Sequence, residues 1–317
     1  MAEAEGGESS GLTPRRSTAG PALHPRPRGL RTLVIVDRIE QAAPAVAGSL
    51  SRRLPRVLGG LAAFAALAYG AAIGGLYHWQ EALLFHPTPL PADHRFDLPD
   101  VVERRIGVDG ATLSALHLRL PAPNGVVFFL HGNAGNLATW FTGASFYRQA
   151  NYDLVMIDYR GYGKSTGRIE SEEQLRADVR AAWDAIAPEY VGKRTVIYGR
   201  SLGTGLAATL SADVGPDLTV LVSPYCTMGE VARHHYPWVP ASLLRYPLDA
   251  CAVVARIASP VLLVHGEKDP VIPVTQSERL LERSPQARLL RIPEAGHGDV
   301  HRFDVYLETL TERLRSL

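Results

Sequence analysis

The apolar and polar positions of the chain fall into one long uncharged stretch near the N-terminus and many short apolar runs beyond it. Residues 57–77 contain no charged side chain. A helix of this length reaches about 30 Å, which is the thickness of the hydrocarbon core of a bilayer. The pattern therefore predicts a transmembrane helix over 57–77, although a buried helix of the domain or a signal peptide would give a similar stretch. Residues 78–100 are polar, contain several prolines and have no sustained period, so we interpret them as a linker.

Short apolar runs alternate with helical patterns from residue 101 to the C-terminus. The stretches 101–108 and 111–120 flank Asp109-Gly110, a strong signal for a β-hairpin. The later runs are rich in β-branched and aliphatic residues, as is typical of strands covered on both faces; they are 126–130, 154–157, 195–198, 218–222, 261–264 and 289–292. Alternation at this spacing predicts a single α/β domain over 101–317, with a mostly parallel central sheet and helices on both faces.

The segment before the uncharged stretch is rich in Pro, Gly, Ser and Arg. Such a composition buries little apolar surface, so we expect residues 1–56 to be a disordered tail. Arg52, Arg53 and Arg56 precede the predicted transmembrane helix, and no Lys or Arg follows it until Arg95. The positive-inside rule then predicts a cytoplasmic N-terminus and a catalytic domain on the far side of the membrane, which is the periplasm if the protein is bacterial.

Overall charge and cysteine content exclude several classes of protein. The net charge is +1, which gives no support for nucleic-acid binding. Cys226 and Cys251 are the two cysteines of the chain, so it is neither a disulfide scaffold nor a zinc module. They would pair in an oxidising compartment or lie as two small buried side chains, and both interpretations stay open. The loop 158–165 lacks the spacing of a phosphate-binding loop, and we expect no cofactor and no metal.

A candidate nucleophile stands in the pentapeptide Gly199-Arg200-Ser201-Leu202-Gly203. This G-x-S-x-G follows the apolar run 195–198 and opens a helix of small residues, the setting of a nucleophile elbow. Glycines on either side of the serine allow the sharp turn from strand to helix. We therefore expect Ser201 to be exposed at the C-terminal edge of the sheet.

A serine hydroxyl needs a base to remove its proton and a third group to orient that base. In enzymes with this elbow the partners follow in the order serine, acid, histidine. Asp269 comes just after the run 261–264, and His297 comes just after the run 289–292. Glu267 is a weaker candidate for the acid, because Asp269 is followed by a proline-bracketed loop. Asp299 is too close to His297 in sequence to orient it from another strand end.

The turn after the run 126–130 is a candidate oxyanion hole. His131-Gly132-Asn133 follows this run directly, and a turn of this kind presents backbone N–H groups to a developing oxyanion. We assign the hole to the N–H groups of Asn133 and of Leu202, the residue after the nucleophile. We expect His265 to pack at a strand end, and His234 and His235 to lie on a cap surface.

Five ordered motifs give the chain a family resemblance. HGNAGN (131–136), DYRGYGKS (158–165), GRSLGTG (199–205), HGEKDPVIP (265–273) and GHGD (296–299) are similar to motifs of the single-pass "alpha/beta hydrolase domain-containing" serine hydrolases. That group includes lysophospholipid lipases, protein depalmitoylases and many bacterial membrane hydrolases. The resemblance covers about residues 79–317 and implies the α/β-hydrolase fold with Ser201, Asp269 and His297 as the triad. The segment 223–260 is short for a cap domain, so no large closed lid is expected.

These observations predict a membrane-anchored serine hydrolase that cleaves a carboxylic ester or thioester, lipid or acylated, through an acyl-enzyme intermediate. Two alternatives stay open. One is a peptidase of the prolyl-oligopeptidase type, and the other is a catalytically inactive hydrolase fold that serves as a membrane-linked binding module. The sequence leaves the oligomeric state and the acyl-chain preference undetermined.

Overall fold

The computed structural model describes the backbone of residues 33–317 and the side chains from Arg53 onward. The chain forms two compact units, residues 1–68 and 69–317. The first unit holds most of helix α1 (Leu33–His78). The stretch Arg53–His78 within α1 spans 26 residues and contains an 18-residue window with a mean hydropathy of 1.8 and no buried residue, so its length and composition suffice to cross a membrane.

Helix α1 begins earlier than the sequence pattern predicted. Residues 1–32 of the predicted disordered tail lie outside the described residues, but residues 33–56 are helical, so the expectation of disorder is corrected there. The physical reason is composition. Most of the Pro and Gly residues of the tail precede Leu33, and the following stretch is rich in helix-forming Ala, Leu and Arg.

The second unit is built on an eight-stranded sheet with the order β10-β9-β8-β7-β4-β6-β3-β2. The hairpin β2 (Val101–Val108) and β3 (Ala111–Leu118) is antiparallel, and β3 also pairs antiparallel with β6 (Tyr152–Ile157). All other neighbours in this sheet are parallel. These other strands are β4 (Gly125–Leu130), β7 (Arg194–Arg200), β8 (Leu218–Val222), β9 (Val261–Gly266) and β10 (Ala287–Ile292). The predicted α/β architecture with a mostly parallel sheet is confirmed.

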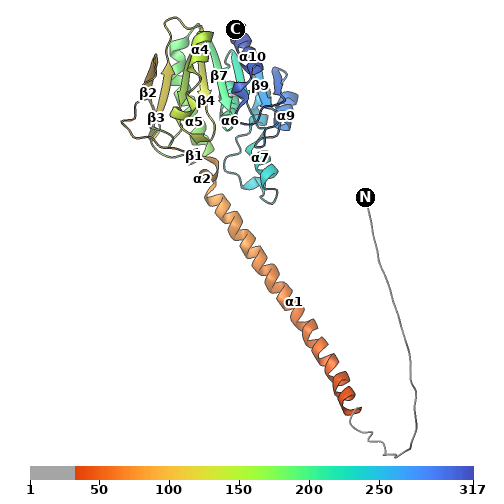
Figure 1. Cartoon of the computed structure of the whole chain (residues 1–317). Coiled ribbons are helices and arrows are strands. Elements are labelled where there is room, and N and C mark those ends of the chain that lie inside the picture. Colours follow the sequence, from red (N-terminus) through yellow and green to blue (C-terminus); the bar gives the residue numbers. More distant parts are fainter. Residues whose placement is uncertain (1–32) are drawn as a thin grey trace, which may run out of the picture. The chain divides into compact units, whose positions relative to one another are not determined.

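Helices cover both faces of the sheet (Figure 1). One buried apolar cluster lies beneath α5 (Glu172–Ile186), α6 (Gly203–Val214) and α9 (Thr275–Arg283). A second cluster lies beneath α4 (Ala144–Ala150) and α10 (Asp304–Arg315). The central strands are buried along their whole length, which explains their nearly continuous apolar sequences.

A short cap joins β8 to β9, and we use the name cap for residues 223–260. It contains α7 (Met228–His235), the 3-10 turn η2 (Ala241–Leu243), α8 (Ala250–Val253) and the 3-10 turn η3 (Val254–Arg256). Cys226 and Cys251 form a disulfide across the base of the cap, with an S–S distance of 2.04 Å. The question that the sequence left open is thus resolved in favour of pairing.

The segment predicted as a linker is partly ordered against the domain, which corrects the expectation for its first half. It forms α2 (Gln80–Leu84) and β1 (His86–Pro87), and β1 pairs in parallel with β5 (Ala134–Gly135). The side chains of Gln80 and Phe85 are buried. Phe85 packs into the apolar core and so holds this segment against the domain. A single buried residue leaves no periodic pattern in the sequence.

Candidate active site

Ser201 sits on a sharp turn between β7 and α6. Its φ is +51°, in the left-handed region that non-glycine residues adopt rarely and at a cost. Its N–H donates to the carbonyl of Val222 at 2.9 Å, which ties the turn to the neighbouring strand. A Cβ on Gly203 would lie 2.1 Å from the Leu130 carbonyl oxygen, so only glycine fits at that position. This packing lifts the serine above the edge of the sheet.

The three residues predicted as a triad form a chain of two hydrogen bonds in which His297 stands between Ser201 and Asp269. His297 Nε2 is 2.9 Å from Ser201 Oγ, and His297 Nδ1 is 2.7 Å from Asp269 Oδ2. Asp269 follows β9 and His297 follows β10, so both side chains reach the site from the C-terminal ends of parallel strands. The Asp269 carboxylate is fully buried, whereas the His297 ring is 23% exposed and open to a substrate.

The environment of Asp269 stabilises its charged form. Its Oδ1 accepts hydrogen bonds from the N–H groups of Val271 and Ile272, both at 2.8 Å. Burial acts to raise the pKa of this carboxyl. The contacts with His265, His297 and the Ile272 N–H outweigh it and hold the pKa of Asp269 well below its ordinary range. The carboxylate is therefore ionised at neutral pH and can stabilise an imidazolium at His297.

His265 supports the acid rather than the nucleophile. The ring is fully buried, and its Nε2 lies 2.8 Å from the Ile272 carbonyl and 3.4 Å from Asp269 Oδ2. Because a carbonyl oxygen only accepts, Nε2 carries the proton, and Nδ1 accepts from the hydroxyl of Ser277 at 2.6 Å. The expectation of a packing residue at a strand end missed this second role, which is to hold the loop around Asp269.

The residues considered as alternatives to Asp269 and His297 make other contacts. Glu267 forms an ion pair with Arg291 at 2.7 Å on the surface. Asp299 accepts the N–H of Gly296 at 2.7 Å and so shapes the turn that presents His297. His234 and His235 are exposed on α7 in the cap.

The predicted oxyanion turn lies beside the nucleophile. A Cβ built on Gly132 would be 3.6 Å from the Cβ of Ser201. The carbonyl of Asn133 accepts from the N–H of His86 at 2.8 Å and from the Tyr162 hydroxyl at 2.6 Å. In the described part of the chain, no hydrogen bond occupies the N–H of Asn133 or of Leu202, which leaves both donors free for a ligand.

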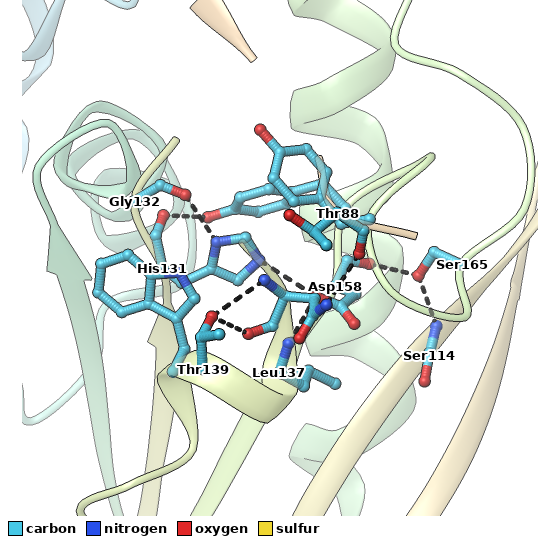
Figure 2. Close-up of polar contacts among 12 residues, drawn as sticks. Thr88, Ser114, His131, Gly132, Leu137, Thr139, Asp158 and Ser165 are labelled. Carbon is cyan, nitrogen blue, oxygen red and sulfur yellow. Dashed lines mark hydrogen bonds and ion pairs between the residues drawn. The ribbon is translucent and has the colours of Figure 1, made fainter. Parts of the chain in front are cut away.

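A buried histidine–aspartate pair lies behind the oxyanion turn, as Figure 2 shows. His131 Nδ1 donates to the Gly132 carbonyl at 2.7 Å, and its Nε2 faces Asp158 Oδ1 at 3.6 Å. Asp158 Oδ1 also accepts the N–H of Leu137 at 3.0 Å. Both side chains are inaccessible to solvent, and burial raises the pKa of Asp158 although contact with His131 offsets part of the effect. No pattern in the loop 158–165 indicated that Asp158 supports the oxyanion turn.

An apolar cleft of about 560 Å³ opens beside the triad. Three of its lining residues are close chain neighbours of the site: Ala134 follows Asn133, Arg200 precedes Ser201 and Gly298 follows His297. The Arg200 guanidinium donates to the Gly298 carbonyl at 2.6 Å and lies 5.4 Å from the ring centre of Trp140. The volume lies within the range of small-molecule sites. From Arg53 onward, no group of three or more His, Cys, Asp or Glu side chains is placed to hold a metal ion.

Comparison with known proteins agrees with the fold and the motifs. Residues 121–248 match a family model described as "Serine aminopeptidase, S33", and residues 245–305 match one described as "TAP-like protein". "Uncharacterized protein Rv2307c" of Mycobacterium tuberculosis is 33% identical over 76% of this chain and 89% of its own length. "Alpha/beta hydrolase domain-containing protein 17B" of Xenopus laevis is 33% identical over 61% of this chain and 67% of its own length.

Solved structures share the architecture at lower sequence identity. The Pyrococcus furiosus esterase Pf2001 superposes with a TM-score of 0.61 at 18% identity, covering 74% of this chain and 97% of the esterase. Est1E from Butyrivibrio proteoclasticus, solved with ferulic acid bound, gives a TM-score of 0.54 at 20% identity over 67% of this chain and 96% of its own. On the sequence relatives, the family models and this shared fold, the chain belongs to the α/β-hydrolase superfamily and is a hydrolase.

Proposed function

We propose that the protein is a membrane-anchored serine hydrolase that cleaves carboxylic esters or thioesters through an acyl-enzyme intermediate. The observation that carries the proposal is the continuous hydrogen-bond chain from Ser201 Oγ through His297 to the buried Asp269. A base that is oriented by a carboxylate and in contact with a serine hydroxyl is the arrangement that activates serine for acyl transfer.

In the first half of the reaction, Ser201 Oγ attacks the acyl carbon while its proton passes to His297 Nε2. The N–H groups of Asn133 and Leu202 stabilise the negative oxygen of the tetrahedral intermediate. The intermediate collapses as His297 returns the proton to the departing alkoxide or thiolate. Asp269 stays ionised throughout, because its hydrogen bonds stabilise the carboxylate in the folded protein.

In the second half, His297 takes a proton from a water molecule, whose oxygen attacks the acyl-enzyme. The second tetrahedral intermediate releases the carboxylic acid and returns the proton to Ser201. The apolar cleft beside Arg200 and Gly298 would hold the acyl or the leaving-group side of a small-molecule or lipid substrate.

Two features support an anchor with the domain outside the cytoplasm. Arg52, Arg53 and Arg56 precede the uncharged stretch, and the next Lys or Arg along the chain is Arg95. The Cys226–Cys251 disulfide is of a kind that persists in oxidising compartments and is rare in a reducing cytosol. Alkaline phosphatase fused after Leu317 should then be active, and activity of a cytoplasm-restricted reporter in its place would contradict this orientation.

Labelling with a fluorophosphonate probe tests the enzymatic proposal. The wild-type chain should be labelled at Ser201, and the variant Ser201→Ala should not be. A folded wild-type protein that remains unlabelled would refute the proposal and leave the binding-module alternative standing.

A peptidase is a second candidate, favoured by the description of the model that matches residues 121–248. A panel of p-nitrophenyl esters of increasing chain length beside aminoacyl p-nitroanilides separates the two. Rates with the esters should exceed those with the anilides, and the reverse order would favour the peptidase.

A further inference from the structure

The exposed aromatic side chains of the described part of the chain gather in two segments far apart in sequence. From Arg53 onward, every exposed Phe, Tyr or Trp side chain lies either in the stretch 64–79 or at positions 236 and 238. The other exposed large apolar residues outside these segments are valines and leucines. Trp and Tyr are enriched where a protein crosses the boundary between water and lipid.

The second segment is an uncharged loop within the cap. Residues 236–243 (YPWVPASL), which we call the cap tip, carry no charge, whereas Arg233 and Arg245 flank them on either side. Tyr236 and Trp238 are exposed to 57% and 50%. Such a run of exposed apolar residues in a charged surface marks an interaction site.

Hydrogen bonds within the protein occupy part of the backbone of the cap tip. Trp238 O accepts the Tyr69 hydroxyl at 3.1 Å, and Val239 N–H donates to the Tyr236 carbonyl at 3.0 Å. Leu243 N–H donates to the Pro240 carbonyl, and the two prolines of the tip have no N–H to satisfy. A polar backbone group without a partner costs several kcal/mol in lipid, so these hydrogen bonds lower the cost of placing the cap tip there. The N–H groups of Trp238, Ala241 and Ser242 have no such partner among the described residues.

The base of the cap tip is attached to the segment that follows α1. The buried side chain of Gln80 donates to the Leu243 carbonyl at 2.7 Å and accepts the N–H of Arg245 at 2.8 Å. Glu81 accepts the Tyr246 hydroxyl at 2.9 Å and forms an ion pair with Arg245 at 2.5 Å. The cap tip is therefore held beside the end of α1.

The position of Tyr69 sets the depth of the cap tip. Tyr69 lies within the span Arg53–His78 and about 13 Å along the helix axis from His78, at 1.5 Å per residue. A span of 26 residues exceeds a hydrocarbon core of about 30 Å by a few ångströms at each end. Tyr69, and with it the Trp238 carbonyl, would then lie several ångströms inside the hydrocarbon edge, the depth of interfacial segments that lie in one leaflet.

We propose that the cap tip, centred on Trp238, is a second membrane contact that enters the lipid bilayer beside α1. The inference rests on the membrane anchor proposed above. His235 Nε2 donates to the Val271 carbonyl at 2.8 Å, and the N–H of Val271 donates to Asp269, so the cap tip is linked to the loop that carries the acid. This attachment joins the proposed lipid contact to the loop that carries the catalytic acid.

Quenching by brominated lipid tests the depth of Trp238. The full chain is reconstituted in dioleoylphosphatidylcholine vesicles in which part of the lipid carries bromine on its acyl chains. The chain has four tryptophans, of which Trp140 and Trp183 belong to the globular domain. In the variant Trp79→Phe we expect about one third of the emission to be quenched, because one of the three remaining tryptophans contacts lipid. In Trp79→Phe/Trp238→Phe we expect almost no quenching, because the two remaining tryptophans belong to the globular domain and only residues at the bilayer boundary contact lipid.

The outcomes separate this inference from the proposed anchor. Quenching of Trp79 in the variant Trp238→Phe, without quenching of Trp238 in Trp79→Phe, would overturn the cap-tip contact and leave the anchor intact. Absence of quenching at both tryptophans would overturn both. Quenching at both supports the cap-tip contact.

Activity provides a second test with a matched control. Trp238→Glu should lower hydrolysis of a long-chain acyl ester embedded in the same vesicles by about tenfold or more, because a charged side chain enters lipid poorly. Hydrolysis of water-soluble p-nitrophenyl acetate should be unchanged. Val191→Glu, at an 85% exposed position next to the N-terminal end of β7, should affect neither substrate. Equal rates of Trp238→Glu and wild type on the embedded ester would overturn the proposal.

Discussion

Replacing Asp269 with asparagine tests the triad most directly, because the structure dictates how the new amide must lie. Oδ1 of Asp269 accepts two backbone N–H groups, from Val271 and Ile272. An asparagine must place its carbonyl oxygen there, since its NH₂ group would point two donors at two donors. The NH₂ group then faces Nδ1 of His297.

That orientation forces the wrong tautomer of His297. Nδ1 must accept from the amide, so the ring proton moves to Nε2, which now donates to Ser201 instead of accepting its proton. We expect kcat to fall by about a thousandfold to ten-thousandfold, as for the loss of the equivalent carboxylate in other serine hydrolases. This corresponds to about 4–5 kcal/mol of transition-state stabilisation.

Burst kinetics with p-nitrophenyl butyrate measure the acylation step, and Glu267→Gln is the matched control. Glu267 is the other carboxylate of the same loop, but it pairs with Arg291 on the surface, so its variant should stay within about twofold of wild type. An Asp269→Asn variant that acylates within tenfold of wild type, or a Glu267→Gln variant that loses as much activity, would refute this reasoning.

The same substitution has an effect on stability that depends on pH. The pKa of Asp269 is lower in the folded chain than its ordinary value, so its charged form contributes stability above that ordinary value, near 4. This contribution is lost as the pH falls through the folded-state pKa. In urea, the free energy of unfolding of Asp269→Asn should be lower than that of wild type at pH 7, and the difference between the two should become smaller below pH 4. A difference that does not depend on pH would contradict the assignment.

Three further predictions concern the nucleophile elbow, the disulfide of the cap and the support of the oxyanion turn. Gly203→Ala should abolish labelling by the fluorophosphonate probe, because its Cβ would lie 2.1 Å from the Leu130 carbonyl oxygen, while Gly107→Ala, where the space is open, should be labelled normally. Cys226→Ser should lower the free energy of unfolding in urea by about 3 kcal/mol, and a reductant should destabilise wild type but not the variant. Asp158→Ala should cost about 2 kcal/mol by leaving a buried N–H without an acceptor, and Asp158→Asn, which keeps that acceptor, should cost less than half as much.

Local patterns in the sequence determined the elements of this protein and the order of its candidate catalytic groups. The predicted run 218–222 is β8 itself, and the hairpin strand 101–108 is β2, because a buried strand must be apolar along its length and a tight turn needs its glycine. Ser201, Asp269 and His297 could be selected because each follows an apolar run, and the C-terminal ends of parallel strands meet at one edge of the sheet.

Only the tertiary structure decided which residues support that site. Contacts between distant segments leave no periodic signal: β1 pairs with the strand beyond the oxyanion turn, Asp158 lies behind His131, and Cys226 meets Cys251. The same holds for the cap tip, which reaches Tyr69 across a separation of 169 residues. Such contacts are selected by shape and burial when the whole chain packs, whereas strands, turns and capping residues are selected by their immediate neighbours in sequence.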